Sequence, residues 1–358
     1  MPRAAGLFHQ AIAQSVPGVF FAMPLAADIT AAIAGELGVH ATRAELSDVD
    51  PLRLAAAGDA VNLTMHRYGD RWGPAARSAS PYAPVLDGDV LPATPWHALA
   101  AAAARDVPPI AGHTRDECRL LLAMSGQLGT IDDGQAARAP ARFGPGPNAE
   151  RAYRAAYPDL TAEGLYEPVQ TDSLFRMPTL NLAQAQTAGG GLAHLYELTW
   201  PAPANAGILD ACHGLDGPLT FGNLTDGFAD RLIGSPTPPE AENVSARFRT
   251  AWTRFATTGD PGRPTHHPQH RLTRVFDTPP TVTTYPEETS RRLWENHGSP
   301  RHSPPARRRN PLRQPAFREA LRQGGGSARR GVRWACSRDR WRAAGRGYDL
   351  PDLRRQGR

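Results

Sequence analysis

Short apolar runs alternate with longer segments of helical periodicity over the first 300 residues, and this alternation limits the fold more than any other feature of the sequence. The clearest strand is 193–200, where hydrophobic and polar residues alternate. The clearest helices are 241–257 and 24–37, each with apolar residues recurring on one face, and Gly38 follows the second as a stop. Strands that alternate with helices of this length predict an α/β protein with a largely parallel sheet.

The same patterns predict weaker elements between these. The further strands and helices that we expect lie at 7–15, 108–112, 44–57, 94–104 and 172–186. The strand at 7–15 is expected to be buried, and the last helix is expected to be capped by Asp172. Residues 131–148 are rich in Gly, Ala and Pro, which predicts a surface loop.

Charge divides the chain into an acidic body and a basic tail. Residues 301–358 hold 17 arginines against four acids, and the first 300 residues hold 23 arginines against 31 acids. No sustained periodicity follows residue 298, so we predict one folded region at 1–298 and a disordered tail at 299–358. Arginine-rich segments can bind phosphates, but a shifted reading frame in a GC-rich genome gives the same composition. Nucleic-acid binding is therefore not expected.

Several classes of protein are disfavoured by composition. No run of eighteen apolar residues occurs, which argues against a membrane span, and the N-terminus does not resemble a secretory signal. The three cysteines, Cys118, Cys212 and Cys336, are far apart, so neither a disulfide framework nor a zinc site is expected and a cytoplasmic location is favoured. The histidines of 265–270 are interrupted by Pro268, and no metal is expected there.

Two segments carry residues suited to catalysis. Ile-Ala-Gly-His-Thr-Arg-Asp-Glu, at 110–117, places a carboxylate after a short strand. Asp-Ala-Cys-His-Gly-Leu-Asp-Gly-Pro-Leu-Thr-Phe-Gly-Asn-Leu, at 210–224, places a histidine in a glycine-flanked loop after the next strand. An acid and a histidine so arranged can orient and polarise an imidazole base. Taken singly, Glu117 could be a solvated loop acid and His213 a hydrogen-bonded loop histidine.

In their order along the chain these segments resemble the type-B carboxylesterase family, which includes para-nitrobenzyl esterases and cholinesterases. Its G-x-x-x-D-E-G and H-G-x-E-x-x-F-x-F-G motifs are matched around Glu117 and His213. Three further matches are Leu-Phe-His-Gln-Ala-Ile-Ala-Gln-Ser at 7–15, Asp-Ser-Leu-Phe-Arg-Met-Pro at 172–178 and Trp-Thr-Arg-Phe-Ala-Thr-Thr-Gly-Asp-Pro at 252–261. The resemblance covers about residues 1–297.

The resemblance implies an α/β-hydrolase fold and hydrolysis of small carboxylic esters through an acyl-enzyme, with no cofactor. It implies that Glu117 is the acid of a catalytic triad and His213 is its general base. The serine matching Ser15 lies behind the acid in this family, so Ser15 is expected to hydrogen-bond Glu117 and orient it.

The sequence also departs from the family pattern. No serine has the two flanking glycines of the G-x-S-x-G nucleophile elbow, and the family's oxyanion-hole glycines are absent. Cys118 stands where glycine is usual and Asp216 where glutamate is usual. We therefore expect an α/β-hydrolase fold that lacks its N-terminal strands and nucleophile elbow, with an exposed sheet edge and no esterase activity alone. A non-catalytic hydrolase-like binding protein is the alternative.

Overall fold

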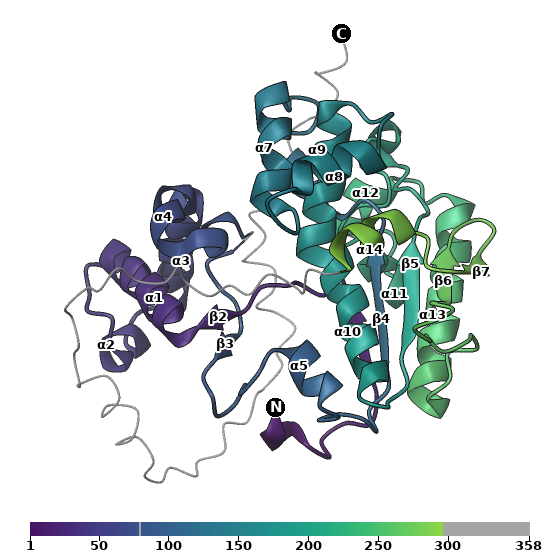
Figure 1. The fold of residues 1–358 in the computed structure, drawn as a ribbon, viewed down its shortest axis with the longest axis horizontal. Coiled ribbons are helices and arrows are strands. Elements are labelled where there is room, and N and C mark those ends of the chain that lie inside the picture. Colours follow the sequence, from purple (N-terminus) through teal and green to yellow (C-terminus); the bar gives the residue numbers. More distant parts are fainter. Residues whose placement is uncertain (79, 296–358) are drawn as a thin grey trace.

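A five-stranded sheet in the order β1-β4-β5-β6-β7 forms the centre of the structure (Figure 1). The structure is a computed structural model and describes residues 1–78 and 80–295. The strands are β1 (Ala11–Gln14), β4 (Pro109–Thr114), β5 (His194–Leu198), β6 (Thr273–Phe276) and β7 (Thr281–Thr283). The first four are parallel, and β7 pairs antiparallel to β6. The predicted α/β class with a largely parallel sheet is confirmed.

Helices cover both faces of the central strands β4 and β5. On one face Ile110 and Tyr196 pack against α13 (Pro239–Thr258) and α11 (Asp216–Phe221). On the other face Ala111 and Leu195 pack against α10 (Met177–Ala188). Every residue of β4 and β5 is therefore buried, as in other parallel sheets covered on both sides.

Strand β1 differs from the buried strand predicted at 7–15. It contains only residues 11–14, it lies at the edge of the sheet, and its residues are half-buried or exposed. Leu7, Phe8 and Ile12 remain exposed, and no strand within the described residues pairs with the outer side of β1. The prediction of burial was wrong because hydrophobic composition alone does not reveal whether a strand has neighbours on both sides.

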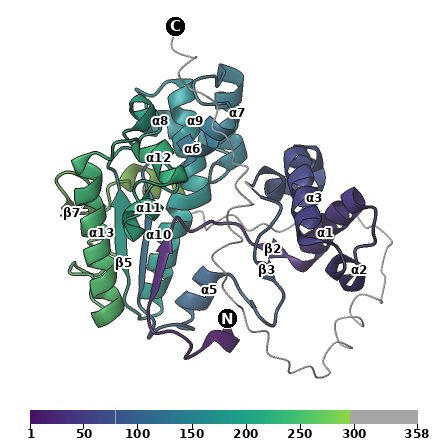
Figure 2. The same cartoon turned by 180° about the vertical axis from the view of Figure 1, so that it is seen from behind.

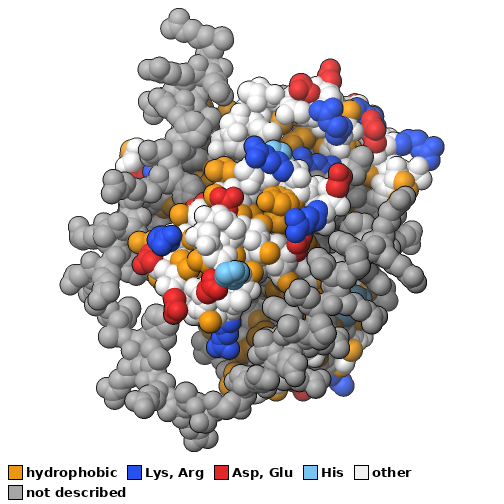
Figure 3. All heavy atoms as spheres, turned by 90° about the vertical axis from the view of Figure 1, so that its left-hand side faces the viewer, with side chains coloured by type: hydrophobic (Ala, Val, Ile, Leu, Met, Phe, Trp, Pro, Cys, Tyr) orange, Lys and Arg blue, Asp and Glu red, His pale blue; other side chains and the backbone are white. Residues whose placement is uncertain are grey.

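A helical lobe inserted between β1 and β4 stands beside the sheet (Figures 1 and 2). Its elements are β2 (Phe21–Ala22), α1 (Met23–Leu37), α2 (Arg43–Ser47), α3 (Pro51–Thr64), η2 (Met65–Tyr68), α4 (Gly69–Trp72), η3 (Gly73–Arg77) and β3 (Val85–Leu86). It has its own hydrophobic core, in which α1 packs against α3 and Trp72. Acidic and basic side chains are interspersed on the visible part of its outer face (Figure 3).

The predicted helix at 24–37 is confirmed, and Gly38 ends it in the left-handed conformation. The single helix predicted at 44–57 is wrong, because α2 ends at Ser47 and α3 begins at Pro51. The side chain of Asp50 accepts hydrogen bonds from the amides of Leu52 and Arg53, which starts a second helix.

Two further predictions were wrong for local reasons. Residues 131–148 contain α7 (Asp133–Phe143), not only a loop, and Asp132 and Gln135 form a capping box at its start. Asp172 does not cap a helix, because it lies inside one continuous helical run. That run consists of α9 (Ala162–Thr171), the π-helical turn η4 (Asp172–Arg176) and α10.

The remaining described helices lie around the sheet and the lobe. They are η1 (Pro2–Ala4), α5 (Pro95–Ala100), α6 (Glu117–Met124), α8 (Ala149–Ala156), η5 (Ala204–Gly207), α12 (Gly227–Ile233) and α14 (Glu288–Trp294). Within residues 1–78 and 80–295 no helix is both long and apolar enough to cross a bilayer. The tail predicted at 299–358 lies outside the described residues.

Candidate active site

Glu117 and His213 meet at one edge of the sheet because β4 and β5 are parallel neighbours. Glu117 is the first residue of α6, shortly after the end of β4 at Thr114, and His213 lies in the loop that follows β5. A short parallel bridge between Asp116 and Cys212 joins the two segments, and the amide of His213 donates to the carbonyl oxygen of Glu117 at 3.2 Å. The carboxyl ends of adjacent parallel strands thus place the acid beside the imidazole.

The two side chains form a direct hydrogen bond. Nδ1 of His213 lies 2.6 Å from Oε2 of Glu117. The carboxylate can only accept, so the proton is on Nδ1 and Nε2 is the basic nitrogen. Glu117 is fully buried, whereas the His213 side chain is 35% exposed. Within the described residues Nε2 has no hydrogen-bond partner, so it is available to a reacting group.

Ser15 completes the environment of the acid. Its Oγ donates to Oε1 of Glu117 at 2.6 Å, and the amide of Thr114 donates to the same oxygen at 2.9 Å. Ser15 follows β1, so three neighbouring strands each contribute to this cluster. The structure therefore brings together all three residues that the sequence analysis selected as site residues.

The charges of the pair stabilise each other. Burial by itself would raise the pKa of Glu117, but the hydrogen bond and charge of His213, with the Ser15 hydrogen bond, outweigh burial and lower that pKa. Burial would likewise lower the pKa of His213, and the hydrogen bond and charge of Glu117, with the charge of Asp216, raise it instead. The environment thus favours an imidazolium held against a carboxylate.

Neither cysteine near the site has the properties of a nucleophile. Cys118 and Cys212 are both free and buried. Burial raises the pKa of Cys118 well above its usual value and that of Cys212 to about 12. Both are therefore thiols at neutral pH, and the thiolate is the reactive form.

The helical run α9-η4 supports the start of α6, where the acid lies. The amide of Cys118 donates to Oε1 of Glu167 at 3.1 Å and to Oγ1 of Thr171 at 3.0 Å. A nitrogen of the Arg176 guanidinium donates to the carbonyl oxygen of Arg115 at 2.6 Å. Nothing in the sequence singles out Glu167, Thr171 or Arg176, because a single sequence does not show which residues of a distant helix contact the segment around Glu117.

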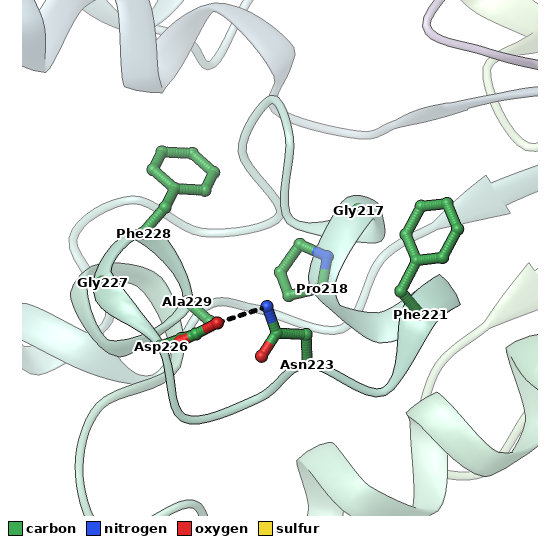
Figure 4. A pocket seen from close by; sticks show the side chains of 8 residues that line it. All are labelled: Gly217, Pro218, Phe221, Asn223, Asp226, Gly227, Phe228 and Ala229. Atoms are coloured by element: carbon green, nitrogen blue, oxygen red, sulfur yellow. Dashed lines mark hydrogen bonds between the residues drawn. The ribbon is translucent and has the colours of Figure 1, made fainter. Parts of the chain in front are cut away.

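An open apolar hollow adjoins the histidine loop. It has a volume of about 720 Å³. Figure 4 shows the residues that line it, which are Gly217, Pro218, Phe221, Asn223, Asp226, Gly227, Phe228 and Ala229. Phe221 is 81% exposed and Phe228 is 48% exposed. A Cβ atom added to Gly214, the neighbour of His213, would lie 3.3 Å from the Phe228 ring. The hollow therefore lies next to the loop that carries His213 and offers aromatic surface.

Metal binding is not indicated by the donor groups. Within the residues that the structure describes, no group of three or more His, Cys, Asp or Glu side chains could hold a metal ion.

The buried Asp216, which stands where the family has glutamate, accepts a hydrogen bond from the Tyr196 hydroxyl at 2.7 Å. It supports the sheet beneath the histidine loop.

Known proteins are similar to this chain in sequence and in fold. The sequence profile of the carboxylesterase family matches residues 1–141. The chain is 28% identical over 314 residues to the para-nitrobenzyl esterase of Bacillus subtilis (strain 168), which covers 83% of the chain and 59% of that relative. It is 31% identical over 283 residues to a probable N-octanoylanthranilate hydrolase of Rhodococcus erythropolis, which covers 76% of the chain and 54% of that relative.

The fold agrees with solved structures of the same group. The structure of carboxylesterase EST55 from Geobacillus stearothermophilus matches with a TM-score of 0.66 at 27% identity, over 82% of this chain and 60% of that one. A para-nitrobenzyl esterase structure matches with a TM-score of 0.65 at 26% identity, over 82% of this chain and 58% of that one. The chain spans less than two thirds of the length of these relatives. Its sequence and fold together show that the chain belongs to the type-B carboxylesterase family.

Proposed function

We propose that this chain carries the acid and the base of a carboxylic ester hydrolase that works through an acyl-enzyme. The attacking serine and the oxyanion hole are proposed to come from residues outside these 358. One observation carries the proposal: buried Glu117 holds Nδ1 of His213 at 2.6 Å while Nε2 has no partner within the described residues. This is the acid–imidazole half of a triad.

In the proposed reaction, Nε2 of His213 takes the proton of the serine hydroxyl as its oxygen attacks the ester carbonyl. The imidazolium then gives this proton to the leaving alcohol, and the acyl group remains on the serine. Water repeats the sequence, losing a proton to Nε2, and its attack releases the carboxylic acid and the free serine. Glu117 keeps its charge throughout and stabilises the imidazolium.

The sheet has a place for a strand that could carry the nucleophile. The outer side of β1 is unpaired within the described residues, and Leu7, Phe8 and Ile12 are exposed near it. A parallel strand added there would end at the same edge as β1, β4 and β5, where Ser15, Glu117 and His213 lie. We therefore propose that a nucleophile on such a strand reaches Nε2 of His213.

The substrates are proposed to be esters with an apolar acyl or alcohol group. The hollow next to the histidine loop includes Pro218, Phe221 and Phe228 in its lining, and these side chains suit an apolar group. The names of the relatives, a para-nitrobenzyl esterase, an N-octanoylanthranilate hydrolase and a phenmedipham hydrolase, indicate substrates with aromatic or alkyl parts. No cofactor enters this reaction.

The first test uses the chain as it is. Purified protein is treated with a fluorophosphonate probe and assayed with p-nitrophenyl butyrate, and we expect neither labelling nor turnover above the blank. Loss of the serine alone costs roughly a million-fold in turnover in a comparable serine hydrolase. Stoichiometric labelling of any residue of this chain would overturn the proposal.

The second test supplies the absent parts. The DNA before the Met1 codon is read for an encoded Gly-x-Ser-x-Gly, in frame or displaced by one base, and the joined protein is produced. We expect it to hydrolyse p-nitrophenyl butyrate and His213→Gln to lower turnover by at least about 10⁴-fold. The matched control is His40→Gln, which breaks the exposed ion pair of His40 with Glu45 in the helical lobe. This variant should keep the turnover of the unchanged joined protein. Activity that survives His213→Gln, or no upstream motif, would count against the proposal.

A further inference from the structure

A π-helical turn interrupts the helical run beside the candidate site. η4 (Asp172–Arg176) separates α9 from α10, and it is anchored at both ends. Asp172 accepts a hydrogen bond from the Tyr153 hydroxyl at 2.7 Å and pairs with Arg176, which in turn donates to the carbonyl oxygen of Arg115. Single π-helical turns inside α-helices are frequent at functional sites because they redirect side chains.

The side chain that this turn directs to the site is Phe175. Its ring stacks on the imidazole of His213, with ring centroids 4.7 Å apart and planes inclined by 29°. Phe175 is only 8% exposed, so it is held in place by its surroundings. One face of the imidazole is therefore covered by a fixed aromatic ring.

This contact supplies a restraint that the acid cannot supply. The hydrogen bond from Nδ1 to Glu117 fixes one atom of the imidazole, but the ring can still tilt about that bond. A tilt changes the direction of Nε2, and a misplacement of about 1 Å can cost roughly 100-fold in rate. A second contact on the face of the ring removes this freedom.

We propose that Phe175 is a positioning residue that fixes the plane of the His213 imidazole, and that the π-helical turn serves to place it there. Its meaning for catalysis rests on the proposed ester hydrolysis. The contact itself does not, because it can be measured on the chain without a nucleophile.

The stack also affects the charge of the imidazole. The face of a phenyl ring is electron-rich, so it favours imidazolium over neutral imidazole. The charged groups around His213 are Glu117 of α6 and Asp216 of α11, and on the π-helical turn Asp172 and Arg176 pair with each other. Leucine in place of Phe175 keeps the apolar cover and removes the aromatic face. We expect Phe175→Leu to lower the pKa of His213 by about half a unit.

The test is an NMR titration of the full 358-residue chain labelled at histidine. The His213 signals are assigned by their loss in His213→Gln. Phe175→Leu is expected to lower the His213 pKa and to broaden its Nδ1–H signal. Phe175→Tyr, which keeps an aromatic ring, is expected to leave both as they are in the unchanged chain. The matched control is Phe255→Leu, which removes another buried ring, one that contacts His194 and not His213. That change should leave His213 unaffected.

An unchanged pKa and an unchanged Nδ1–H signal in folded Phe175→Leu would overturn the proposal. If circular dichroism shows that Phe175→Leu does not fold, Phe175→Met is titrated in its place with the same expectation. In the joined protein, Phe175→Leu should lower kcat with little change in KM and move the acid limb of the pH profile down by the same half unit. If Phe175→Leu lowers the His213 pKa but the joined protein does not hydrolyse esters, the positioning role of Phe175 is supported and the proposed ester hydrolysis is contradicted.

Discussion

Ser15 combines a hydrogen bond to the acid with an unusual backbone. Its φ of +54° lies in the left-handed region, which a non-glycine residue rarely adopts, while its Oγ lies 2.6 Å from Glu117. Strained residues of this kind persist where the surrounding structure requires them, and they concentrate at functional sites. The backbone conformation of Ser15 is the cost of bringing a hydroxyl from β1 to the buried acid.

Two substitutions of Ser15 separate these effects. Ser15→Ala removes a hydrogen bond to a buried carboxylate and is expected to lower the free energy of unfolding by about 1.5–3 kcal/mol. Ser15→Gly loses the same bond but relieves the left-handed strain, so it should cost about 1 kcal/mol less. Urea unfolding monitored by circular dichroism measures both. An equal decrease in the free energy of unfolding in the two variants would contradict the assignment of backbone strain to Ser15.

At the scale of elements, two buried arginines have opposite surroundings. Arg176 of η4 pairs with the fully buried Asp172 and lies near Glu287. Arg263 is 9% exposed, none of its three side-chain nitrogens has a hydrogen-bond partner in the described part of the chain, and it lies over the rings of Trp252, Phe276 and Tyr196 at 5.5–6.0 Å. Burial lowers the pKa of Arg263 to about 9, so it remains charged at neutral pH. A buried charge without an acceptor destabilises a fold.

We therefore expect the same substitution to have opposite effects at the two positions. Arg176→Leu leaves Asp172 buried and unpaired and should lower the free energy of unfolding by about 3–5 kcal/mol. Arg263→Leu removes an unpaired charge and should raise it by about 1–3 kcal/mol after the lost cation–π contacts are counted. Thermal and urea unfolding compare the variants. Destabilisation by Arg263→Leu would mean that this guanidinium has an acceptor.

At the scale of the whole molecule, the outer edge of β1 has no strand partner within the described residues. An unpaired strand edge with apolar side chains is a template for association with another chain. Leu7, Phe8 and Ile12 are exposed there, whereas β7 ends the opposite edge with a short, polar-flanked antiparallel strand. The β1 edge is therefore the surface at which we expect the isolated chain to associate.

Ile12→Lys tests this expectation. A lysine on an edge strand opposes pairing, so the variant should stay monodisperse at concentrations where the unchanged chain forms larger species. Light scattering over a concentration series measures the effect. Leu63→Lys is the matched control, because Leu63 is 79% exposed on α3, in the helical lobe, and the substitution adds the same charge. Equal improvement in both variants would show that net charge, and not the β1 edge, controls association.

The sequence by itself determined the α/β class, the strong elements β5, α1 and α13, and the selection of Ser15, Glu117 and His213. The class and the elements follow from local periodicity. Glu117 and His213 were selected because they follow neighbouring strands and because their segments resemble motifs of the carboxylesterase family, whereas Ser15 was selected through that resemblance alone. Only the tertiary structure decided that Asp172 lies inside a π-helical turn, that Phe175 stacks on His213 and that Arg263 is buried without an acceptor. Those features depend on packing between segments far apart in the chain, which local periodicity does not specify.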